Sequence, residues 1–355
     1  MKGIILHGGH GTRLRPLTHT GPKQLLPIAN KPMSQYGLET LRRAGIKDIA
    51  LIIGGIGSNK VKEYYGNGSQ FGVKITYIEQ DSPRGIAHAV GLCKDFVEND
   101  KFLVFLGDNI IQKDINDFVE KFKHSDAVAS LLLCEVADPS KFGVAEIENG
   151  KLVKITEKPK KPVTNLVVTG IYFLTPKIFN IIKKLKPSWR NELEIADAFQ
   201  ILLNENEKIT YDIITDYWKD TGTPEDILHA NKSILENNVS FFYGNKENNV
   251  SINGKVMIEE GATIKNGSQI VGPAIIGKNC LIEPNTRIGP NTSIGDNSIL
   301  SQCDIEDTIV MSNCTIKGKM KIRKSIISTN SKILTSAANY DEKIFLLGEG
   351  TIILF

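Results

Sequence analysis

Cysteine is scarce in this 355-residue chain, and the few cysteines are not spaced to act together. Their number is odd and no two form a Cys-x-x-Cys pair: Cys93, Cys134, Cys280, Cys303 and Cys314. This pattern argues against a disulfide framework and against a zinc site. We therefore expect a protein of the reducing cytoplasm.

Long apolar runs and a strong net charge are missing as well. No stretch of 18 apolar residues occurs, and residues 1–6 lead into a glycine-rich loop instead of forming a signal peptide. The formal net charge of +3 is too small to predict a nucleic-acid or membrane partner. With 41% hydrophobic and 23% charged residues, the composition is that of an ordinary globular protein, and the length favours two domains.

The most informative stretch is the glycine-rich loop at residues 8–14, Gly-Gly-His-Gly-Thr-Arg-Leu, which follows the apolar, strand-like residues 3–6. Glycines allow several backbone N–H groups to converge on a phosphate. Arg13 adds a bidentate donor, and Lys23, in the stretch Pro-Lys-Gln-Leu-Leu-Pro at 22–27, adds a compact positive charge. The loop therefore predicts phosphate binding, although a plain strand-to-helix turn is the alternative.

The loop matches neither of the two commoner phosphate-binding motifs. A Walker loop needs Gly-Lys-Ser/Thr after four intervening residues, and the dinucleotide fingerprint needs a third glycine where Leu14 stands. A dinucleotide-binding oxidoreductase is for this reason the weakest of the functions considered.

A carboxylate later in the chain is a candidate metal ligand. Asp108 follows a predicted buried strand at residues 102–106, and ligands of open α/β sheets gather at the carboxyl ends of such strands. Mg²⁺ commonly takes one or two protein carboxylates together with nucleotide phosphates. The pair Asp108-Asn109 alone is equally compatible with an ordinary turn. The phosphate loop upstream makes the metal the better interpretation.

These motifs resemble a known family. Gly-Gly-x-Gly-Thr-Arg-Leu followed by Pro-Lys-Gln-Leu-Leu-Pro is similar to the signature of the sugar-1-phosphate nucleotidyltransferases, and most similar to their glucose-1-phosphate thymidylyltransferase branch, in its long form. Phe-Gly-Val at 142–144, Glu-Lys-Pro at 157–159 and Trp-Lys-Asp at 218–220 resemble further pieces of the site. His7 and Phe142 depart from the family, which more often has a small residue and a tyrosine there.

The resemblance implies a reaction and a set of residues. The reaction is transfer of a thymidylyl group from dTTP to glucose 1-phosphate with Mg²⁺ as cofactor, releasing pyrophosphate. The implied catalytic residues are Arg13, Lys23, Asp108 and Asp220, the last two as metal ligands. The implied nucleotide-binding residues are Gly8, Gly9, Gly11, Thr12, Arg13, Gln24, Gln80 and Gly85. The implied sugar-phosphate-binding residues are Gly143, Glu157, Lys158, Val168, Tyr172 and Arg190.

Gln24 and Gln80 are the expected readers of the base. A primary amide offers a donor and an acceptor side by side, which matches the O4 and N3–H edge of uracil or thymine. Gly85 would permit close approach of the base. His88 stands where the family often has glutamine, and we interpret it as a surface residue of a helix.

The pattern of apolar and polar residues changes after a polar, asparagine-rich stretch at residues 236–251. Apolar residues then recur at every sixth position: Ile258, Ile264, Ile270, Ile276, Ile282, Ile288, Ile294 and Leu300. The register changes near Asp304 and resumes at Val310, Ile316 and Ile322. A strict six-residue period is typical of a hexapeptide β-helix, and its left hand is implied by the resemblance.

The sequence thus predicts an α/β protein in three parts. Residues 1–235 alternate short apolar runs with helical stretches and predict a Rossmann-like nucleotidyltransferase domain with a mostly parallel sheet. Residues 236–251 are the predicted linker, and 252–355 the predicted left-handed β-helix domain.

Several alternatives stay open at this point. They are a uridylyltransferase using UTP, a bifunctional enzyme with acetyl transfer in the repeat domain, and a non-catalytic regulatory subunit. All six histidines precede residue 230, so the repeat domain lacks the base that hexapeptide acetyltransferases usually employ, and we expect it to be structural. A regulatory subunit would have lost charged site residues, yet all of these are present: Arg13, Lys23, Asp108, Lys158 and Asp220.

The last twelve residues, 344–355, include eight large apolar ones and end on Phe355. Their β-branched and aromatic content predicts a strand, and a free strand of this kind would be prone to aggregation. We therefore expect the tail to be paired, either as a cap of the β-helix or in a homo-oligomer, which we favour.

Overall fold

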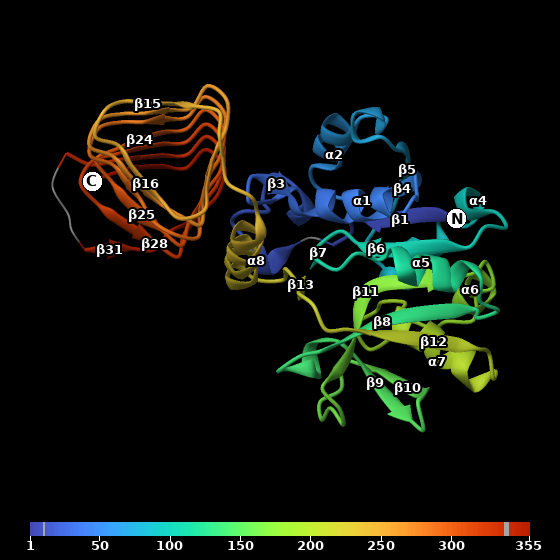
Figure 1. Cartoon of the computed structure of the whole chain (residues 1–355). Coiled ribbons are helices and arrows are strands. Elements are labelled where there is room, and N and C mark those ends of the chain that lie inside the picture. The colour runs from blue at the N-terminus through green and yellow to red at the C-terminus, as the bar shows by residue number, and fades with distance from the viewer. Residues whose placement is uncertain (10, 337–340) are drawn as a thin grey trace. The chain divides into compact units, whose positions relative to one another are not determined.

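A computed structural model describes residues 1–9, 11–336 and 341–355, so His10 of the glycine-rich loop lies outside the described residues. The chain forms two compact units. The first consists of Met1–His10 and Met33–Asp220, and the second of Gly11–Pro32 and Thr221–Phe355. Figure 1 shows the helices and strands of both units.

The first unit is built on one twisted sheet. Its parallel core pairs β1 (Lys2–Leu6) with β4 (Asp48–Ile53) and β6 (Phe102–Leu106), and β4 with β5 (Lys74–Glu79). This is the predicted Rossmann-like arrangement. The other strands of the sheet are β8 (Ala129–Glu135), β9 (Gly143–Glu148), β10 (Lys151–Glu157), β11 (Leu166–Leu174) and β12 (Ile209–Ile214).

Strand β11 joins the two halves of this sheet. It runs antiparallel to β6 on one side and to β8 on the other, and it touches β9 near its start. The predicted hairpin is confirmed, because β9 and β10 pair in antiparallel fashion around Asn149 and Gly150. Both residues have positive φ, as a type I′ turn requires.

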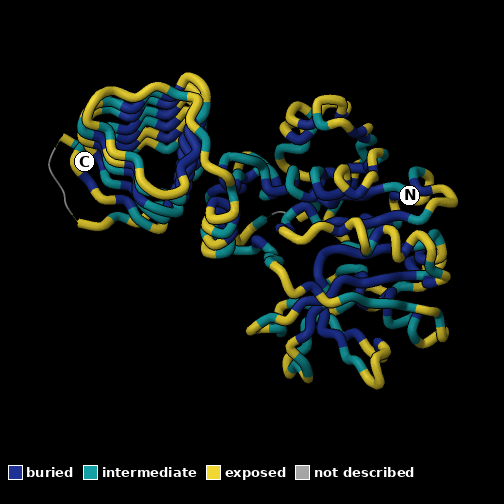
Figure 2. The backbone as a smooth tube through the Cα atoms, in the orientation of Figure 1, coloured by how far each residue is buried: buried dark blue, intermediate teal, exposed yellow. Residues whose placement is uncertain are grey.

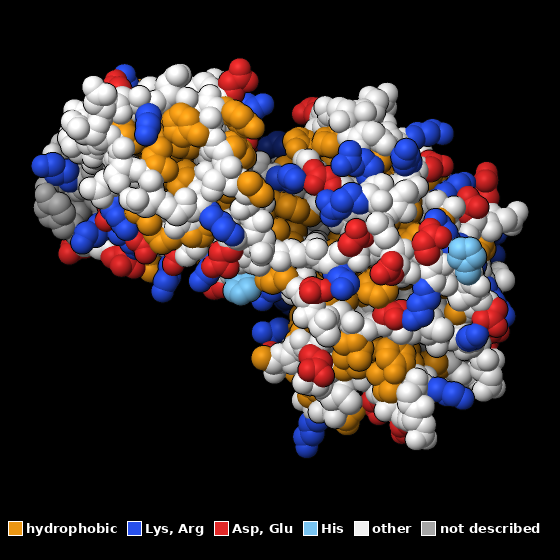
Figure 3. Space-filling model, in the orientation of Figure 1, with side chains coloured by type: hydrophobic (Ala, Val, Ile, Leu, Met, Phe, Trp, Pro, Cys, Tyr) orange, Lys and Arg blue, Asp and Glu red, His pale blue; other side chains and the backbone are white. Residues whose placement is uncertain are grey.

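Helices cover the sheet and its central strands are buried, as Figure 2 shows. The helices of this unit are α1 (Met33–Arg43), α2 (Ser58–Tyr65), α3 (Ile86–Gly91), α4 (Lys94–Val97), α5 (Asn116–Lys123), α6 (Ile178–Ile182) and α7 (Ile195–Asn204), with short 3₁₀ turns η3 (Ser69–Phe71) and η4 (Pro139–Lys141). One continuous core joins α3, α6 and α7 to the sheet. The face in Figure 3 carries intermixed charges of both signs, as the small net charge suggests.

The second unit begins with the segment 11–32 and continues with a long helix and the repeats. The segment holds η1 (Thr12–Leu14), η2 (Lys23–Leu25) and a hairpin of β2 (Pro27–Ile28) and β3 (Lys31–Pro32). Helix α8 (Pro224–Asn237) starts at a capping box in which Thr223 and Asp226 bond reciprocally. The expected helix entry at this point is confirmed.

The repeats form a parallel β-helix with three sheets. The first sheet is β14 (Phe241–Phe242), β17 (Val256–Ile258), β20 (Ala274–Ile276), β23 (Thr292–Ile294), β26 (Ile309–Val310), β29 (Ile326–Ile327) and β32 (Leu346–Leu347). The second is β15 (Asn245–Lys246), β18 (Thr263–Ile264), β21 (Leu281–Ile282), β24 (Ile299–Ser301), β27 (Thr315–Lys317), β30 (Lys332–Leu334) and β33 (Ile352–Leu354). The third is β16 (Ser251–Asn253), β19 (Gln269–Val271), β22 (Arg287–Ile288), β25 (Asp304–Glu306), β28 (Lys321–Arg323) and β31 (Glu342–Lys343).

The six-residue period places one apolar side chain per strand inside each coil. Each residue of the predicted series is fully buried: Ile258, Ile264, Ile270, Ile276, Ile282, Ile288, Ile294 and Leu300. The predicted change of register is also confirmed, since Ile288 pairs with Ile305, one position earlier than the preceding repeats would place it. The series resumes with the buried Val310, Ile316 and Ile322.

The polar stretch 236–251 is not only a linker. It contains β14 and β15, which form the first coil and pair with β17 and β18. The last twelve residues contain β32 and β33, which pair with β29 and β30 and so form the final coil. The expected strand character of the tail is confirmed. Among the described residues, no helix has both the length and the apolar character needed to cross a membrane.

Candidate functional site

A cavity of about 150 Å³ opens in the first unit at the carboxyl end of β6. It brings together predicted residues that are far apart in sequence: Asp108, Gly143, Glu157, Lys158, Val168, Tyr172 and Asp220. Parallel strands of an open α/β sheet present their ligands at this end, so the location agrees with the sheet topology.

Strand pairing brings the two predicted metal ligands close together. Asp108 lies just before β7 (Asn109–Ile111), and β7 pairs in antiparallel fashion with β13 (Trp218–Asp220), placing Asp220 opposite Asn109. Burial raises the pKa of the Tyr172 hydroxyl, and the carboxylates Glu157, Asp108 and Asp220 raise it further. These carboxylates therefore act on the same buried hydroxyl at the cavity.

Asn109 connects three elements of the site, a role that the sequence analysis missed. Its Oδ1 accepts hydrogen bonds from the Gly170 N–H at 3.1 Å and from Trp218 Nε1 at 2.8 Å, and its Nδ2 donates to Asp108 Oδ1 at 3.1 Å. A side chain at position 170 would begin 2.8 Å from the Asn109 amide, so β11 needs glycine there. The Asp-Asn pair is more than a turn, because Asn109 orients Asp108.

The two cations predicted to bind the sugar phosphate each lie beside carboxylates. Lys158 Nζ lies 3.4 Å from Glu157 Oε1, and Arg190 Nη1 lies 3.5 Å from the same oxygen. Arg190 also pairs with Glu192 at 2.7 Å and with Glu194 at 3.4 Å. Burial raises the pKa of Glu157, against the opposing effect of the two cations. Glu194 also lines the cavity, and the sequence analysis did not include it among the candidate residues.

Lys158 has an unusual backbone for a lysine. Its φ is +42°, in the left-handed region that side chains other than glycine rarely adopt, and its N–H donates to the Phe142 carbonyl at 2.9 Å. Backbone strain of this kind clusters at binding sites, where the surrounding structure holds it. The strain at Lys158 therefore supports its assignment to the site.

The predicted base reader Gln80 has a partner that fixes its orientation. Gln80 is buried at the end of β5, and its Nε2 donates to Nδ1 of His88 at 2.9 Å. Its Oε1 faces Gly8, because a side chain at position 8 would begin 3.3 Å from that oxygen. His88 is thus half-buried and part of the network, instead of the expected surface residue.

Packing against Leu193 requires glycine at position 85. Its φ is +98°, and a side chain there would begin 2.4 Å from the backbone carbonyl oxygen of Leu193. Nearby backbone groups bond to Leu193, whose N–H donates to the Arg84 carbonyl and whose carbonyl accepts from the Ala87 N–H. Gly85 therefore joins α3 to the segment that carries Arg190.

The remaining predicted residues belong to the loop. Gly8 and Gly9 are in the first unit, while Gly11, Thr12, Arg13, Lys23 and Gln24 are in the second. Gly11 has a φ of +58° and its carbonyl accepts from Thr18 Oγ1 at 2.8 Å, which closes the loop on itself. Arg13 is exposed on η1, and Gln24 is buried within η2.

The donor set suits a metal that takes much of its coordination from phosphate. No group of three or more His, Cys, Asp or Glu side chains that could hold a metal occurs within residues 1–9, 11–336 and 341–355. A pair of carboxylates is nevertheless what Mg²⁺ needs when nucleotide phosphates supply other ligands. Asp108 and Asp220 fit that description, and an all-protein metal cage does not occur in the described ranges.

The chain is similar to known proteins over its whole length. Residues 2–237 match the nucleotidyl transferase family model, and residues 270–349 match the GMPPB C-terminal domain. A glucose-1-phosphate thymidylyltransferase of Streptomyces antibioticus is 41% identical over 98% of this chain and 98% of its own length. The low-salt glycan biosynthesis nucleotidyltransferase Agl11 of Haloferax volcanii is 46% identical over 74% of both chains.

Solved structures agree with this. The crystal structure of a putative glucose-1-phosphate thymidylyltransferase from Bacillus anthracis, in complex with a sucrose, is 44% identical and has a TM-score of 0.64. It covers 68% of this chain and 97% of its own. The Rossmann-like domain is therefore confirmed, and the three parallel sheets that follow it have the arrangement of a left-handed β-helix.

Proposed function

Because the chain belongs to the nucleotidyl transferase family, we propose that it transfers the thymidylyl group of dTTP to glucose 1-phosphate, giving dTDP-glucose and pyrophosphate. Sugar-1-phosphate nucleotidyl transfer is the activity of its thymidylyltransferase relatives, including the full-length relative from Streptomyces antibioticus. The observation that carries the proposal is that β7 and β13 bring Asp108 and Asp220 to the same cavity as Lys158.

The chemistry asks the protein mainly to position two anions. A phosphate oxygen of glucose 1-phosphate attacks the α-phosphorus of dTTP in line, and pyrophosphate leaves. No general base is required, since that oxygen is already a nucleophile at neutral pH. Asp108 and Asp220 would hold Mg²⁺, which when bound neutralises phosphate charge.

Different basic side chains of this chain bind the two substrates. Lys158 and Arg190 bind the phosphate of the sugar substrate. This phosphate competes for the two cations with Glu157, which pairs with both of them in the structure. Arg13 holds the leaving pyrophosphate, and Lys23 the reacting phosphates. Around the hexose, Glu157 accepts hydrogen bonds from hydroxyls while Gly143, Val168 and Tyr172 form the wall.

The network at Gln80 supports selection of the base. Because its Nε2 is used by His88, Gln80 presents its Oε1 as an acceptor, which suits the N3–H of thymine or uracil. Gln24 is the second reader. Cytosine has an acceptor at N3 and would be rejected.

A bifunctional enzyme is the alternative with an observation behind it. A "Bifunctional protein GlmU" of Methanocaldococcus jannaschii is 40% identical over 74% of this chain, which spans 61% of that protein. Against acetyl transfer, the sequence from residue 230 onward contains no histidine to act as base. We therefore propose that the β-helix is structural, and acetyl-CoA-dependent acetylation of a sugar phosphate would contradict this.

A substrate panel tests the proposal. Pyrophosphate release is measured for dTTP, UTP and GTP with a set of sugar 1-phosphates. We expect dTTP to be best and UTP to be used less well, because one methyl in a pocket is worth about 1–3 kcal/mol, and we expect GTP to be poor. GTP as the best substrate would show that the roles of Gln24 and Gln80 are wrong.

A further inference from the structure

Several of the residues proposed to bind the triphosphate and read its base lie on one segment, which the C-terminal part of the chain supports. Arg13, Lys23 and Gln24 all lie on the segment 11–32, and this segment forms one compact unit with residues 221–355. The segment 11–32 therefore packs with α8 and the β-helix.

The tip of the β2–β3 hairpin is strained. Ala29 and Asn30 have φ values of +47° and +63°, in the left-handed region, which asparagine tolerates and alanine rarely adopts. Such a conformation persists where neighbouring groups hold it. The hairpin begins two residues after Leu25, the end of η2, so the position of the tip constrains Lys23 and Gln24.

One buried amide holds this tip. Asn231 of α8 is fully buried, and its Oδ1 accepts hydrogen bonds from the Ala29 N–H at 2.8 Å and from Ser293 Oγ at 2.7 Å. Its Nδ2 donates to the Asn291 carbonyl at 3.0 Å. A single side chain therefore joins the hairpin, the helix and the β23 coil of the β-helix.

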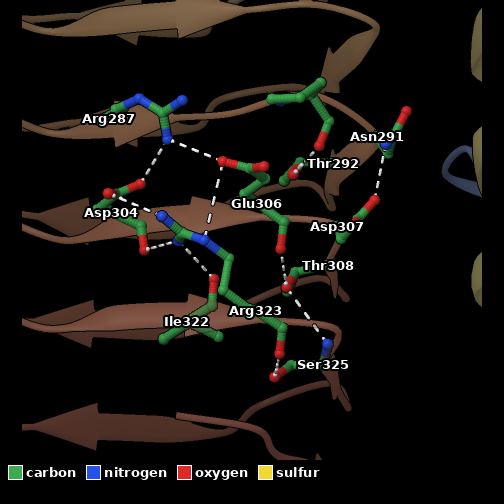
Figure 4. Close-up of polar contacts among 11 residues, drawn as sticks. Arg287, Asn291, Thr292, Asp304, Glu306, Asp307, Thr308, Ile322, Arg323 and Ser325 are labelled. Carbon is green, nitrogen blue, oxygen red and sulfur yellow. Dashed lines mark hydrogen bonds and ion pairs between the residues drawn. The ribbon is translucent and has the colours of Figure 1, made fainter. Parts of the chain in front are cut away.

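Two further contacts join the segment 11–32 to the β-helix. Asn30 Nδ2 donates to the Ile294 carbonyl at 2.7 Å, so the β23 coil bonds directly to the second residue of the tip and reaches the first through Asn231. In the last coil, a side chain added at Gly348 would begin 3.3 Å from Pro16, which shows how closely that coil approaches the segment. Figure 4 shows that Asn291 is itself fixed, because its Nδ2 donates to Asp307 at 2.7 Å.

We propose that Asn231 and the β23 coil position the nucleotide-binding segment, so that the β-helix sets the affinity of the enzyme for its triphosphate. The inference rests on the proposed function. Leucine at position 231 would leave the Ala29 N–H, the Ser293 hydroxyl and the Asn291 carbonyl without this partner in a buried place, where loss of a partner is costly. The tip would then leave its strained conformation, and Lys23 and Gln24 would move with it.

The test compares Asn30→Gly and Asn231→Leu with the wild-type full-length enzyme. Asn30→Gly is the sharper variant, because glycine keeps the left-handed backbone and only the amide is lost. Asn279→Gly is the matched control: Asn279 also has positive φ, at +54°, and its amide bonds to the exposed Asn297 within the β-helix.

We expect the KM for dTTP to rise about fivefold or more in both variants, the cost of one lost hydrogen bond, while the KM for glucose 1-phosphate changes less than about twofold. Hydrogen exchange of residues 11–32 should accelerate in both variants and stay unchanged in the control. A change limited to melting temperature would indicate a structural role only and would overturn the inference.

The outcomes separate the two proposals. If Asn231→Leu does not fold, Asn30→Gly decides, and unchanged dTTP KM and exchange in that variant would overturn the positioning role. A wild-type enzyme that rejects dTTP would instead overturn the proposed function. In that event the exchange of residues 11–32 alone decides: acceleration supports the anchoring of the segment, and its absence overturns it.

Discussion

Gln80 donates from Nε2 to Nδ1 of His88 at 2.9 Å, and this hydrogen bond determines which atom of the glutamine faces away from α3. The bond requires a neutral His88 that carries its proton on Nε2. Burial lowers the pKa of His88, and the positive charge of the nearby Arg84 lowers it further, so the neutral form is favoured.

Replacing His88 should therefore weaken selection of the base. In His88→Leu the amide of Gln80 is free to turn, and we expect kcat/KM for dTTP to fall about tenfold, the value of one hydrogen bond, with a smaller fall for dCTP. His124→Leu is the control, since His124 is exposed and bonds to a carbonyl of its own helix. Unchanged discrimination between dTTP and dCTP would show that His88 does not orient Gln80.

Removing either carboxylate at the cavity should slow the chemical step. Asp108→Asn and Asp220→Asn leave phosphate charge uncompensated, and we expect turnover to fall by about a hundredfold or more with Mg²⁺ present. Asp126→Asn removes an exposed ion pair with Lys208, outside the residues of the cavity, and should leave turnover unchanged. Near-normal rates in both site variants would contradict the metal assignment.

His7 should make the fold sensitive to acid. Neither of its ring nitrogens has a hydrogen-bond partner within the described part of the chain, and burial lowers its pKa from 6.5 to about 3, although Asp108 acts in the opposite sense. The unfolded chain therefore binds the proton first as the pH falls. The stability from this group is complete above about pH 6.5 and is lost toward pH 3, by about 1.4 kcal/mol per pH unit.

Urea unfolding between pH 7 and about 4.5 measures this effect directly. In His7→Leu, the fall in the free energy of unfolding over that range should be smaller than in the wild-type protein. Identical pH dependence in the two proteins would show that His7 does not titrate between the folded and unfolded states as inferred.

The C-terminal coil should contribute to both stability and assembly. Deleting residues 344–355 removes β32 and β33 and leaves β29 and β30 as edge strands, so we expect the melting temperature to fall by about 4 °C or more. Ile352 and Leu354 are 62% and 70% exposed, as expected of a surface that a second copy of the chain covers. We therefore expect the full chain to be a homo-oligomer in solution.

A second variant separates the two roles. Ile352→Thr combined with Leu354→Thr keeps the strand and removes its apolar surface. A lower mass in solution without a change in melting temperature would assign the tail to assembly. Unchanged mass and stability in the deletion variant would show that the tail serves neither purpose.

The sequence by itself determined the features that depend on short-range pattern. The six-residue period predicted the buried ladder from Ile258 to Leu300, because each strand and turn repeats the same local geometry. The Asn149-Gly150 pair predicted a hairpin, since its conformation is fixed by residues that prefer positive φ. The strands of the parallel core could likewise be recognised from apolar runs.

The tertiary structure alone decided the contacts made by Asn109, His88 and Asn231. Asn109 bonds to Trp218 and Asn231 bonds to Ala29, in each case a partner far away in the sequence. His88 bonds to Gln80, eight residues away, and that contact depends on side-chain rotamers that the sequence does not reveal. An asparagine in a turn and one that joins a hairpin to a β-helix look alike in the sequence. Which of them is buried and bonded depends on how strands and coils pair over long separations, and the periodicity of a segment carries no information about that pairing.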